Sequence, residues 1–388
     1  MRKKISILIN SIAAGGAERV VSLLLTGLQN DFDIHLVLLY DTIEYDIPAG
    51  QKIFHLHQSP DENGLLKLAK LPFLAIRYKR FCRKHQITTS LSFLKRANYI
   101  NCLAAMSGLQ CRIIISERTY LSNYLRFVGK TGKLTGRFLT KKLYPRADLI
   151  ITNAALIKHD LEKNFSVATA YKVINNPVDL EMIRMKGEEH VDDSLFGTFT
   201  FISVGGFRPE KNYELLIAAF NTIKDLNCKL LLIGKGESEK KLRDLVKEFH
   251  LESQILFPGF DKNPYKFLSK ADCFVLSSDF EGFPNSVQEA LACKLPVIAT
   301  DCQSGPREIL APGTNIETTV TDDIEIGKYG ILVPVKKADL LGNAMRLVYT
   351  DKGLRDMLKD RAAERAADFD IAVIAEKFKH ALLAEQGN

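Results

Sequence analysis

Short runs of β-branched residues and leucine alternate with longer segments of helical periodicity along the whole chain. Such alternation predicts parallel sheets whose crossover helices cover both faces. The first series of predicted strands comprises residues 5–9, 34–40, 89–93, 112–116 and 149–152, and the second comprises residues 200–204, 229–233, 254–257, 273–276, 297–299 and 331–333. The pattern therefore predicts an α/β protein with two doubly wound parallel sheets.

The two series are separated by the segment Asn-Asn-Pro-Val-Asp at residues 175–179 and by a polar stretch that continues to Thr198. Proline and clustered polar residues are typical of a linker. We therefore expect a first domain at residues 1–177, a second at residues 178–365 and a C-terminal helix within residues 366–388. The helical pattern runs from Asp370 to Gln386, and we expect this helix to pack back on the first domain.

A length of 388 residues fits two domains, and 46% hydrophobic with 26% charged residues is typical of globular proteins. Seven cysteines without a C-x-x-C pair predict neither a disulfide framework nor a structural zinc site, which fits a reducing cytoplasm. The apolar run at residues 5–9 ends at Asn10, too early for a signal peptide. No apolar run reaches about 18 residues, so we expect no conventional membrane span.

Ligands of open parallel sheets bind at the carboxyl ends of the strands, and the first candidate there is the loop that contains Gly15 and Gly16. Glycine lets the backbone approach a ligand closely, and the helix expected to begin near Ala17 offers its N-terminus to an anion. A tight turn explains the two glycines equally well, because the dinucleotide fingerprint G-x-G-x-x-G is absent. The sequence leaves the function of this loop open.

Residues 205–212 (GGFRPEKN) directly follow the first strand of the second series. Arg208 can bind phosphate oxygens with its planar guanidinium, and Lys211 can bind them as a point charge. The alternative is a solvated loop, but the position at a strand end favours a phosphate site. The loop at residues 234–236 (GKG) follows the next strand, where Gly234 would allow a similar close approach.

The most specific pattern is E-x7-E, formed by Glu281 and Glu289 around a Gly-Phe-Pro turn and a predicted helix start. We expect Glu281 to accept hydrogen bonds from sugar hydroxyls and Glu289 to bind a ribose. The helix N-terminus near Asn285 and Ser286 is available to a diphosphate. Paired carboxylates also occur in glycoside hydrolases, but the nearby cations favour a nucleotide ligand.

Together these elements resemble a known family. The glycine pair, the cation pair, the E-x7-E element and the Asn-Pro-Val-Asp linker are similar to those of the retaining nucleotide-sugar glycosyltransferases of family 4, which have the GT-B fold. The resemblance covers essentially the whole chain. More narrowly, residues 9–21 (INSIAAGGAERVV), 71–75 (LPFLA) and 259–265 (GFDKNPY) are similar to the N-acetylgalactosaminyltransferases that extend lipid-linked oligosaccharides for bacterial protein N-glycosylation.

The resemblance implies two Rossmann-like domains that face each other across a cleft, with the UDP-sugar on the second and the acceptor on the first. Arg208 and Lys211 would neutralise the diphosphate as the glycosidic bond breaks, and Glu281 would hold the donor sugar. The other donor-binding residues that the resemblance implies are Gly15, Gly16, Arg118, Gly234, Pro258, Phe260, Asn285, Ser286 and Glu289.

No metal or other cofactor is expected. The D-x-D motif of metal-dependent glycosyltransferases occurs by letter at residues 31–33 and 368–370, but we interpret these aspartates as turn and cap residues that precede their nearest regular elements. Family members often have a histidine in a pattern like S-E-H where this chain has Ser116, Glu117 and Arg118. Arginine stays protonated and cannot act as a general base. The front-face attack attributed to the family needs none, because the departing phosphate oxygen takes the acceptor proton.

Residues 60–147 contain 18 Lys or Arg and three acidic residues, a local charge of +15 in a chain of +7. Between Leu65 and Lys84 large apolar residues alternate with cations, and Pro72 makes residues 73–84 the stronger half of a helix. This combination predicts contact with an anionic membrane surface through Arg77, Lys79, Arg80, Arg83 and Lys84. The alternative is a helix packed on the first sheet with a solvated basic side. No nucleic-acid module accompanies the charge, so we expect no nucleic-acid partner.

The sequence thus predicts a UDP-sugar-dependent, retaining hexosyltransferase that acts in protein N-glycan assembly. The sugar would be an N-acetylhexosamine, GalNAc in our interpretation, and the acceptor an undecaprenyl-diphosphate-linked saccharide. We expect a cytoplasmic enzyme bound peripherally to the inner face of the cell membrane. The competing hypotheses are the same fold acting in lipopolysaccharide or capsule synthesis and, from another class, a non-catalytic nucleotide-sugar sensor. The missing fingerprint excludes a dehydrogenase.

Overall fold

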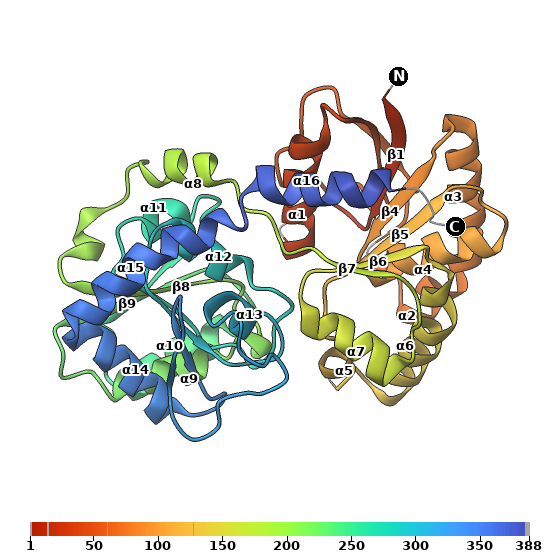
Figure 1. The fold of residues 1–388 in the computed structure, drawn as a ribbon. Coiled ribbons are helices and arrows are strands. Elements are labelled where there is room, and N and C mark those ends of the chain that lie inside the picture. Colours follow the sequence, from red (N-terminus) through yellow and green to blue (C-terminus); the bar gives the residue numbers. More distant parts are fainter. Residues whose placement is uncertain (1, 14, 60, 127, 385–388) are drawn as a thin grey trace. The chain divides into compact units, whose positions relative to one another are not determined.

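The computed structural model describes residues 2–13, 15–59, 61–126 and 128–384. The chain divides into two compact units, one made of residues 1–177 with 371–388 and the other of residues 178–370 (Figure 1). The second unit ends at residue 370 and not at the expected residue 365, because α15 (Lys352–Ala367) continues past residue 365. α16 (Ile371–Leu383) then packs on α1 (Gly16–Leu28) in the first unit. Gln386, the expected last position of this helix, lies outside the described residues.

The first unit is built on a parallel seven-stranded sheet with the order β3-β2-β1-β4-β5-β6-β7. Its strands are β1 (Lys3–Ile9), β2 (Phe32–Leu38), β3 (Lys52–His55), β4 (Thr89–Phe93), β5 (Arg112–Glu117), β6 (Leu149–Thr152) and β7 (Tyr171–Val173). The sequence pattern located all of these except β3 and β7. Both are edge strands without a fully buried position, so they lack the apolar run that identifies a buried strand.

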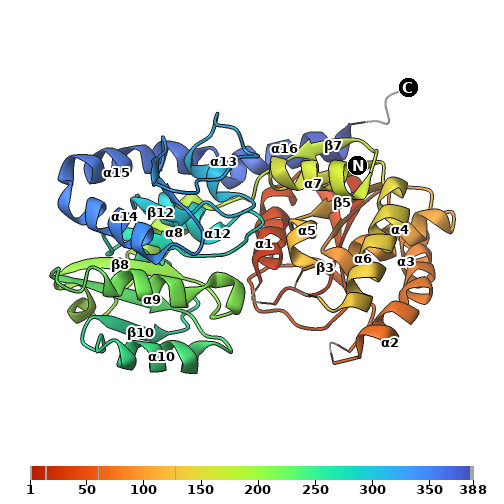
Figure 2. The same ribbon diagram turned by 90° about the horizontal axis from the view of Figure 1, so that it is seen from below.

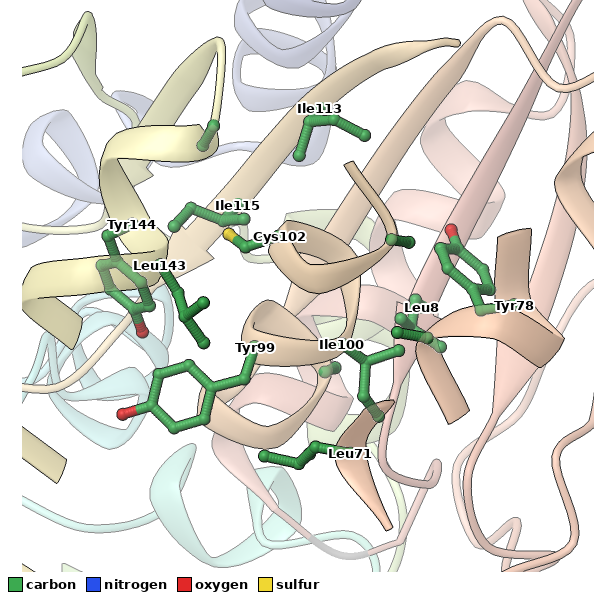
Figure 3. Close-up of a cluster of buried hydrophobic side chains, with 14 of the residues drawn as sticks. Leu8, Leu71, Tyr78, Tyr99, Ile100, Cys102, Ile113, Ile115, Leu143 and Tyr144 are labelled. Atoms are coloured by element: carbon green, nitrogen blue, oxygen red, sulfur yellow. The ribbon is translucent and has the colours of Figure 1, made fainter. Parts of the chain in front are cut away.

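Helices cover both faces of this sheet (Figure 2). α1 and α16 pack on the face to which Ile5, Ile7 and Ile9 point. The other face, with Leu8, packs against α3, α4 and α6 (Figure 3), because successive residues of a strand point to opposite sides. Besides α1 and α16, the first unit contains the helices α2 (Gly64–Ala69), α3 (Leu71–His85), α4 (Lys95–Met106), α5 (Leu121–Tyr124), α6 (Lys130–Leu143), η1 (Tyr144–Arg146) and α7 (Ala155–Phe165).

The second unit has a seven-stranded sheet with the order β10-β9-β8-β11-β12-β14-β13. Its strands are β8 (Phe199–Val204), β9 (Cys228–Ile233), β10 (Ile255–Gly259), β11 (Cys273–Leu276), β12 (Val297–Thr300), β13 (Glu325–Ile326) and β14 (Ile331–Val333). β13 runs antiparallel to β14, and the other pairs are parallel. The pattern missed only β13 among these strands, because two residues are too short for a periodicity.

The helices of the second unit follow the strand-helix alternation that the pattern predicted. They are α8 (Leu180–Gly187), η2 (Asp193–Phe196), η3 (Pro209–Lys211), α9 (Tyr213–Asn221), α10 (Glu239–Glu248), α11 (Tyr265–Leu268), α12 (Asn285–Ala292), α13 (Pro306–Leu310), α14 (Ala338–Thr350) and α15. No helix in the described part of the chain is long and apolar enough to cross a membrane. The seven cysteines are free thiols, and burial raises the pKa of Cys82 and of Cys102 to about 12.

The two D-x-D segments do not both lie where the sequence analysis placed them. Asp33 is inside β2, because this strand begins at Phe32, which pairs with β1, and the Asp33 carboxylate lies 2.6 Å from Lys52 Nζ. Residues 368–370 precede α16, as the sequence analysis expected, and Asp368 is also the C-terminal cap of α15 and lies 2.7 Å from the Arg365 guanidinium. Both aspartates are therefore engaged in ion pairs on the surface of their own unit.

Candidate functional site

The ligand crevice of an open parallel sheet lies where the strand order reverses. In the second unit this point is between β8 and β11, which are neighbours in the sheet. Arg208 and Lys211 lie in the loop after β8, and Glu281 lies in the loop after β11. The topology therefore brings these predicted residues to one edge of the sheet.

Lys211 and Glu281 are in direct contact at this edge. Lys211 Nζ lies 2.6 Å from Glu281 Oε1, and the two side chains are 18% and 10% exposed. Ser278 Oγ donates a second hydrogen bond to the same oxygen at 2.7 Å. The sequence predicted both charged residues for the site but not their pairing, because 70 positions separate them. The pair keeps one cation and one carboxylate in fixed positions beside the strand ends.

The loop after β8 is held by the conformation and side chain of Asn212. Asn212 has a φ of 46°, a left-handed conformation that asparagine tolerates better than most residues. Its side chain accepts a hydrogen bond from the Leu215 N–H at 3.2 Å and donates one to Asp279 at 2.9 Å. Asn212 thus caps the N-terminus of α9 and ties the loop that carries Lys211 to the loop that carries Glu281.

Glycines after β9 allow two loops to pack closely together. A Cβ on Gly234 would collide with Gly205 O, and one on Gly236 would collide with the backbone of Phe207. The Phe207 N–H donates to Lys235 O at 2.9 Å, which ties the loop after β8 to the loop after β9. The structure therefore gives Gly234 a packing role, whatever contact it makes with a ligand.

Three predicted residues near the same edge are exposed. The Arg208 side chain is 60% exposed and lies 3.2 Å from Glu210. Phe260 is 47% exposed, and Lys235 Nζ lies 4.3 Å from the centroid of its ring. Pro258, at the end of β10, is exposed as well. The sequence analysis assigned no role to Glu210 or Lys235, because single charges in surface loops form no pattern.

α12 begins at Asn285, as the sequence predicted, and its cap residue Pro284 supplies no side-chain hydrogen bond. Asn285 and Ser286 in the first turn are half-buried. Glu289, one turn further along, accepts a hydrogen bond from the Tyr265 hydroxyl at 3.0 Å. Tyr265 therefore orients the second carboxylate of the E-x7-E element, and sequence reasoning gave it no role.

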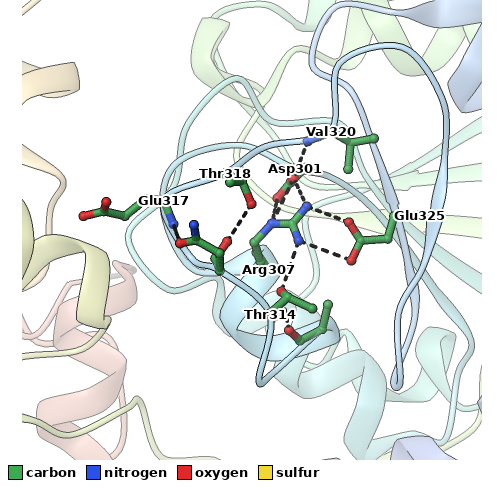
Figure 4. Close-up of polar contacts among 9 residues, drawn as sticks. Asp301, Arg307, Thr314, Glu317, Thr318, Val320 and Glu325 are labelled. Carbon is green, nitrogen blue, oxygen red and sulfur yellow. Dashed lines mark hydrogen bonds and ion pairs between the residues drawn. The ribbon is translucent and has the colours of Figure 1, made fainter.

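A buried charged cluster follows β12 and holds a long loop (Figure 4). Arg307 donates to Asp301 and Glu325 at 2.5–3.2 Å, and Asp301 also accepts from the Val320 N–H at 2.8 Å. The Arg307 and Asp301 side chains are 7% and 1% exposed. Burial acts to lower the pKa of Arg307, but the hydrogen bonds with the two carboxylates outweigh it and raise this pKa. The cluster thus holds the loop after α13 at Thr314 and Val320, and no motif in the sequence predicted it.

In the first unit the corresponding edge contains Glu117, at the end of β5, which is 1% exposed. Its carboxylate accepts hydrogen bonds from the Tyr144 hydroxyl at 2.6 Å and from the N–H groups of Arg118 and Thr119 at 3.0 and 3.1 Å. Burial raises the pKa of Glu117, and Lys95 opposes this shift. The carboxylate is thus satisfied inside its own unit.

Glu117 ends a buried chain of hydrogen bonds on the face that packs against α3 and α4. Successive donor–acceptor distances are 2.5–3.4 Å, and every member of the chain is buried. The chain runs through Ser6, Tyr78, Ser90, Asn101, Ser92, Asn98, Tyr144 and Glu117. Buried polar groups need such partners, because an unpaired one costs free energy of folding.

Arg118, predicted to bind the donor, is 8% exposed. Its guanidinium donates to Ser116 Oγ at 3.1 Å and to the side chain of Asn176. Burial lowers the pKa of Arg118 to about 9, although Glu117 acts in the opposite direction. The Arg118 guanidinium is therefore hydrogen-bonded to residues of the first unit.

Gly15 and Gly16 lie at the start of α1, as the sequence predicted, with Gly15 as the cap residue. The Glu18 carboxylate folds back against Gly15, where a Cβ would collide with it. Burial raises the pKa of Glu18. A carboxylate of the chain itself thus already lies at this helix N-terminus.

The cations predicted to face a membrane lie on α3, where Pro72 is in the first turn. Three of them donate to backbone carbonyls: Arg77 to Leu56 at 2.9 Å, Lys79 to Ser107, and Arg83 to Gly108 at 2.9 Å. Arg80 and Lys84 are exposed. α3 therefore uses part of its charge to hold neighbouring segments of the first unit.

The family model "Glycosyl transferases group 1" matches residues 188–365, and the model "Glycosyltransferase Family 4" matches residues 14–182. The chain is 38% identical, over 96% of its length and 97% of the relative's, to the N-acetylgalactosamine-N,N'-diacetylbacillosaminyl-diphospho-undecaprenol 4-alpha-N-acetylgalactosaminyltransferase of Campylobacter jejuni. The chain belongs to the family 4 glycosyltransferases. This confirms the family that the residue pattern indicated.

Solved structures support the same fold for this glycosyltransferase. Sucrose-phosphate synthase of Thermosynechococcus elongatus matches with a TM-score of 0.79 at 19% identity, covering 98% of each chain. Anabaena HepE in complex with UDP and glucose matches with a TM-score of 0.77 at 18% identity, covering 99% of this chain and 100% of HepE. Two parallel-sheet units and these neighbours confirm the predicted GT-B fold class.

Proposed function

We propose that this glycosyltransferase moves GalNAc from UDP to an undecaprenyl-diphosphate-linked saccharide in protein N-glycan assembly. The observation that carries the proposal is the 38% identity, over 96% of the chain, with the Campylobacter jejuni enzyme named for transfer of N-acetylgalactosamine to such a lipid-linked saccharide. A second Campylobacter enzyme, named as an alpha-1,4-N-acetyl-D-galactosaminyltransferase acting on a diNAcBac-PP-undecaprenol saccharide, is 25% identical over 99% of the chain. UDP as the donor nucleotide is supported by the UDP complex of the similar HepE structure.

Lys211 and Arg208 are the groups that we assign to the diphosphate. The leaving UDP gains negative charge as the glycosidic bond breaks, and cations already in position stabilise that charge without reorganisation. Lys211 is so positioned by Glu281, at 2.6 Å. Arg208 is 60% exposed, and its guanidinium can therefore reach a second phosphate oxygen.

Glu281 has one oxygen, Oε1, engaged by both Lys211 and Ser278. We assign the carboxylate to the donor sugar, because its other oxygen can accept hydrogen bonds from the sugar hydroxyl groups. Glu289, oriented by Tyr265 at 3.0 Å, is assigned to the ribose hydroxyls. These roles separate sugar positioning from nucleotide binding, so the two glutamates have different expected effects on the reaction.

We propose that the reaction needs no metal, because the two cations supply the charge that a metal would supply. In the described ranges, no group of three or more His, Cys, Asp or Glu side chains is arranged to hold a metal ion. We further propose that the enzyme works at the inner face of the cell membrane, where its lipid-linked acceptor would lie. The exposed Phe73 and Ile76, at 62% and 45%, lie beside Arg80 on α3 and support a membrane contact there.

The test is to incubate the purified protein with a panel of UDP-sugars and lipid-linked acceptors and to identify products by mass. We expect GalNAc to be added to the undecaprenyl-diphosphate-linked saccharide. Transfer to a lipopolysaccharide core acceptor instead would support the competing enzyme hypothesis. Binding of UDP-GalNAc without transfer to any acceptor would favour a sensor and contradict the proposal.

A further inference from the structure

Helix α6 presents two large apolar side chains on the surface of the first unit. Leu134 is 71% exposed and Phe138 is 62% exposed. They are four positions apart, so they share one face of the helix. The opposite face is anchored, because Thr140 and Leu143 are buried and the Tyr99 hydroxyl bonds to Thr140 Oγ1 at 3.1 Å. The exposed pair therefore belongs to a packed helix.

Four exposed lysines surround this apolar pair, namely Lys130, Lys133, Lys141 and Lys142. Within the described part of the chain, none of the four ammonium groups has a hydrogen bond, ion pair or ring contact. Arg137, on the same helix, donates to Asn164 O at 2.9 Å. From residue 118 to residue 147 the chain has eight Lys or Arg and no acidic residue. The positive charge of this surface is therefore not neutralised by its own sequence.

α3 differs from α6 in what its cations do. Arg77, Lys79 and Arg83 of α3 donate to backbone carbonyls of the first unit, whereas the four lysines of α6 have no such partners. Charge that is free of internal hydrogen bonds is available to an external anion. α6 is therefore the stronger candidate for an anionic surface, although the sequence pattern pointed to α3.

We propose that α6 docks on an anionic lipid bilayer, with Leu134 and Phe138 inserted at the interface and the four lysines on the headgroups. This proposal rests on the proposed function in one respect, namely that the acceptor is linked to a lipid. A helix with apolar residues flanked by lysines lies in the plane of a bilayer interface, and each lysine near anionic lipid adds to the affinity. A nucleic acid would match the charge but would leave the two apolar side chains in water.

The charge is tested with the full chain and vesicles of phosphatidylglycerol and phosphatidylcholine. Replacing all four α6 lysines by glutamine should lower the vesicle affinity measured by co-sedimentation on the order of 1,000-fold, and binding by the unmodified protein should fall as salt rises. The matched control removes the same charge from four exposed lysines of the second unit, Lys224, Lys240, Lys247 and Lys359. Unchanged binding by the α6 variant, or an equal loss in the control, would overturn the proposal. Loss only on replacing the α3 cations would overturn it as well.

Insertion is tested separately, and the chain is suited to this because it contains no tryptophan. Phe138→Trp should show a blue shift of its emission on addition of anionic vesicles. Met185→Trp, at a 58% exposed position of the second unit, should show none. An emission shift that is no larger for Phe138→Trp than for Met185→Trp would contradict insertion. The lysines would then form a surface for a soluble anion, such as an acidic protein or a nucleic acid. UDP binding and transfer to a short-chain, water-soluble acceptor are measured on the same variants. A failure there counts against the proposed reaction and not against α6.

Discussion

At the carboxyl edge of the second unit, Lys211 and Glu281 keep 18% and 10% of their side chains exposed, and Arg208 keeps 60%. At the corresponding edge of the first unit, Glu117 and Arg118 are 1% and 8% exposed. The two sheets have the same strand order at their reversal points. The topology therefore sets where charges gather, while their hydrogen-bond partners decide whether they remain available to a ligand.

The buried carboxylate of the first unit is tolerated because three donors and the nearby Lys95 compensate for its loss of water. In the second unit one cation and one hydroxyl engage Glu281. We therefore expect substitutions in the second unit to change the reaction and substitutions in the first to change stability.

The largest effect is expected for Lys211→Ala and Arg208→Ala, each of which removes a cation assigned to the leaving diphosphate. The loss of transition-state stabilisation should be about 3 kcal/mol, or on the order of 100-fold to 1,000-fold in turnover. Arg243→Ala is a matched control, because this 47% exposed arginine pairs with Glu239 on α10. Near-normal turnover in both site variants, measured with UDP-GalNAc and the lipid-linked acceptor, would contradict the assignment.

The two glutamates should separate nucleotide binding from turnover. Glu281→Gln keeps the size of the side chain but loses the charge beside Lys211, and it should lower turnover more than UDP affinity. Glu289→Gln should weaken UDP itself by roughly 1.5–3 kcal/mol, the usual contribution of a hydrogen bond to a charged group. Calorimetry with UDP and turnover assays measure the two quantities. The reverse order of effects would exchange the two roles.

In the first unit, Tyr144→Phe removes the hydroxyl that donates to Glu117 at 2.6 Å. The buried carboxylate then lacks one donor, so the free energy of unfolding should fall by about 1–3 kcal/mol, with UDP affinity unchanged. Tyr171→Phe serves as the control, because this hydroxyl bonds to Val167 O in a half-buried position. Urea unfolding and UDP calorimetry test the pair. Weakened UDP binding in Tyr144→Phe would show that the two edges are not functionally separate.

An effect of similar size is expected from the pH dependence that Lys95 contributes. Burial lowers the pKa of Lys95 to about 8 from its ordinary 10.5, although Glu117 opposes the shift. Above pH 8 the folded chain releases this proton first, so stability should rise with pH up to about 10.5, by at most about 1.4 kcal/mol per pH unit. The free energy of unfolding is measured against pH for the native protein and for Lys95→Met. The difference between the two curves removes the contribution of the buried tyrosines, which titrate in both proteins. A difference that stays constant across this window would contradict the burial of the ammonium.

The smallest expected effect is that of a chelator. If Lys211 and Arg208 supply the charge that stabilises UDP, transfer should continue unchanged in EDTA. Product formation is measured with and without EDTA, and then after addition of manganese or magnesium. Activity that disappears with the chelator and returns with the metal would show that the exposed edge of the second unit is incomplete without an ion.

Much of the fold could be predicted because strands buried on both faces must be apolar over their whole length. β11 and β14 are wholly apolar, β6 is apolar except for Thr152, and all three were located without error for this reason. β4 was located as well, although Thr89, Ser90 and Ser92 make it a partly polar strand. The edge strands β3 and β7 were missed because they lie half in solvent. Of the site, Lys211 and Glu281 could be placed in loops after strands, and Asn285 at a helix start, from the sequence. Tyr265 and Glu210 could not, because a residue that orients another carries no pattern of its own.

Residues that are neighbours along the chain determine the strand-helix alternation, the chemistry available after each strand and the family, so these could be read before the fold was known. The tertiary structure decided which charges are paired. Lys211 meets Glu281 across 70 positions, and eight polar side chains form one buried chain that starts at Ser6 and ends at Glu117. It also decided that cations of α3 bond to carbonyls while lysines of α6 do not. Helical periodicity identifies a polar face, but only the folded chain determines whether that face finds partners inside the protein.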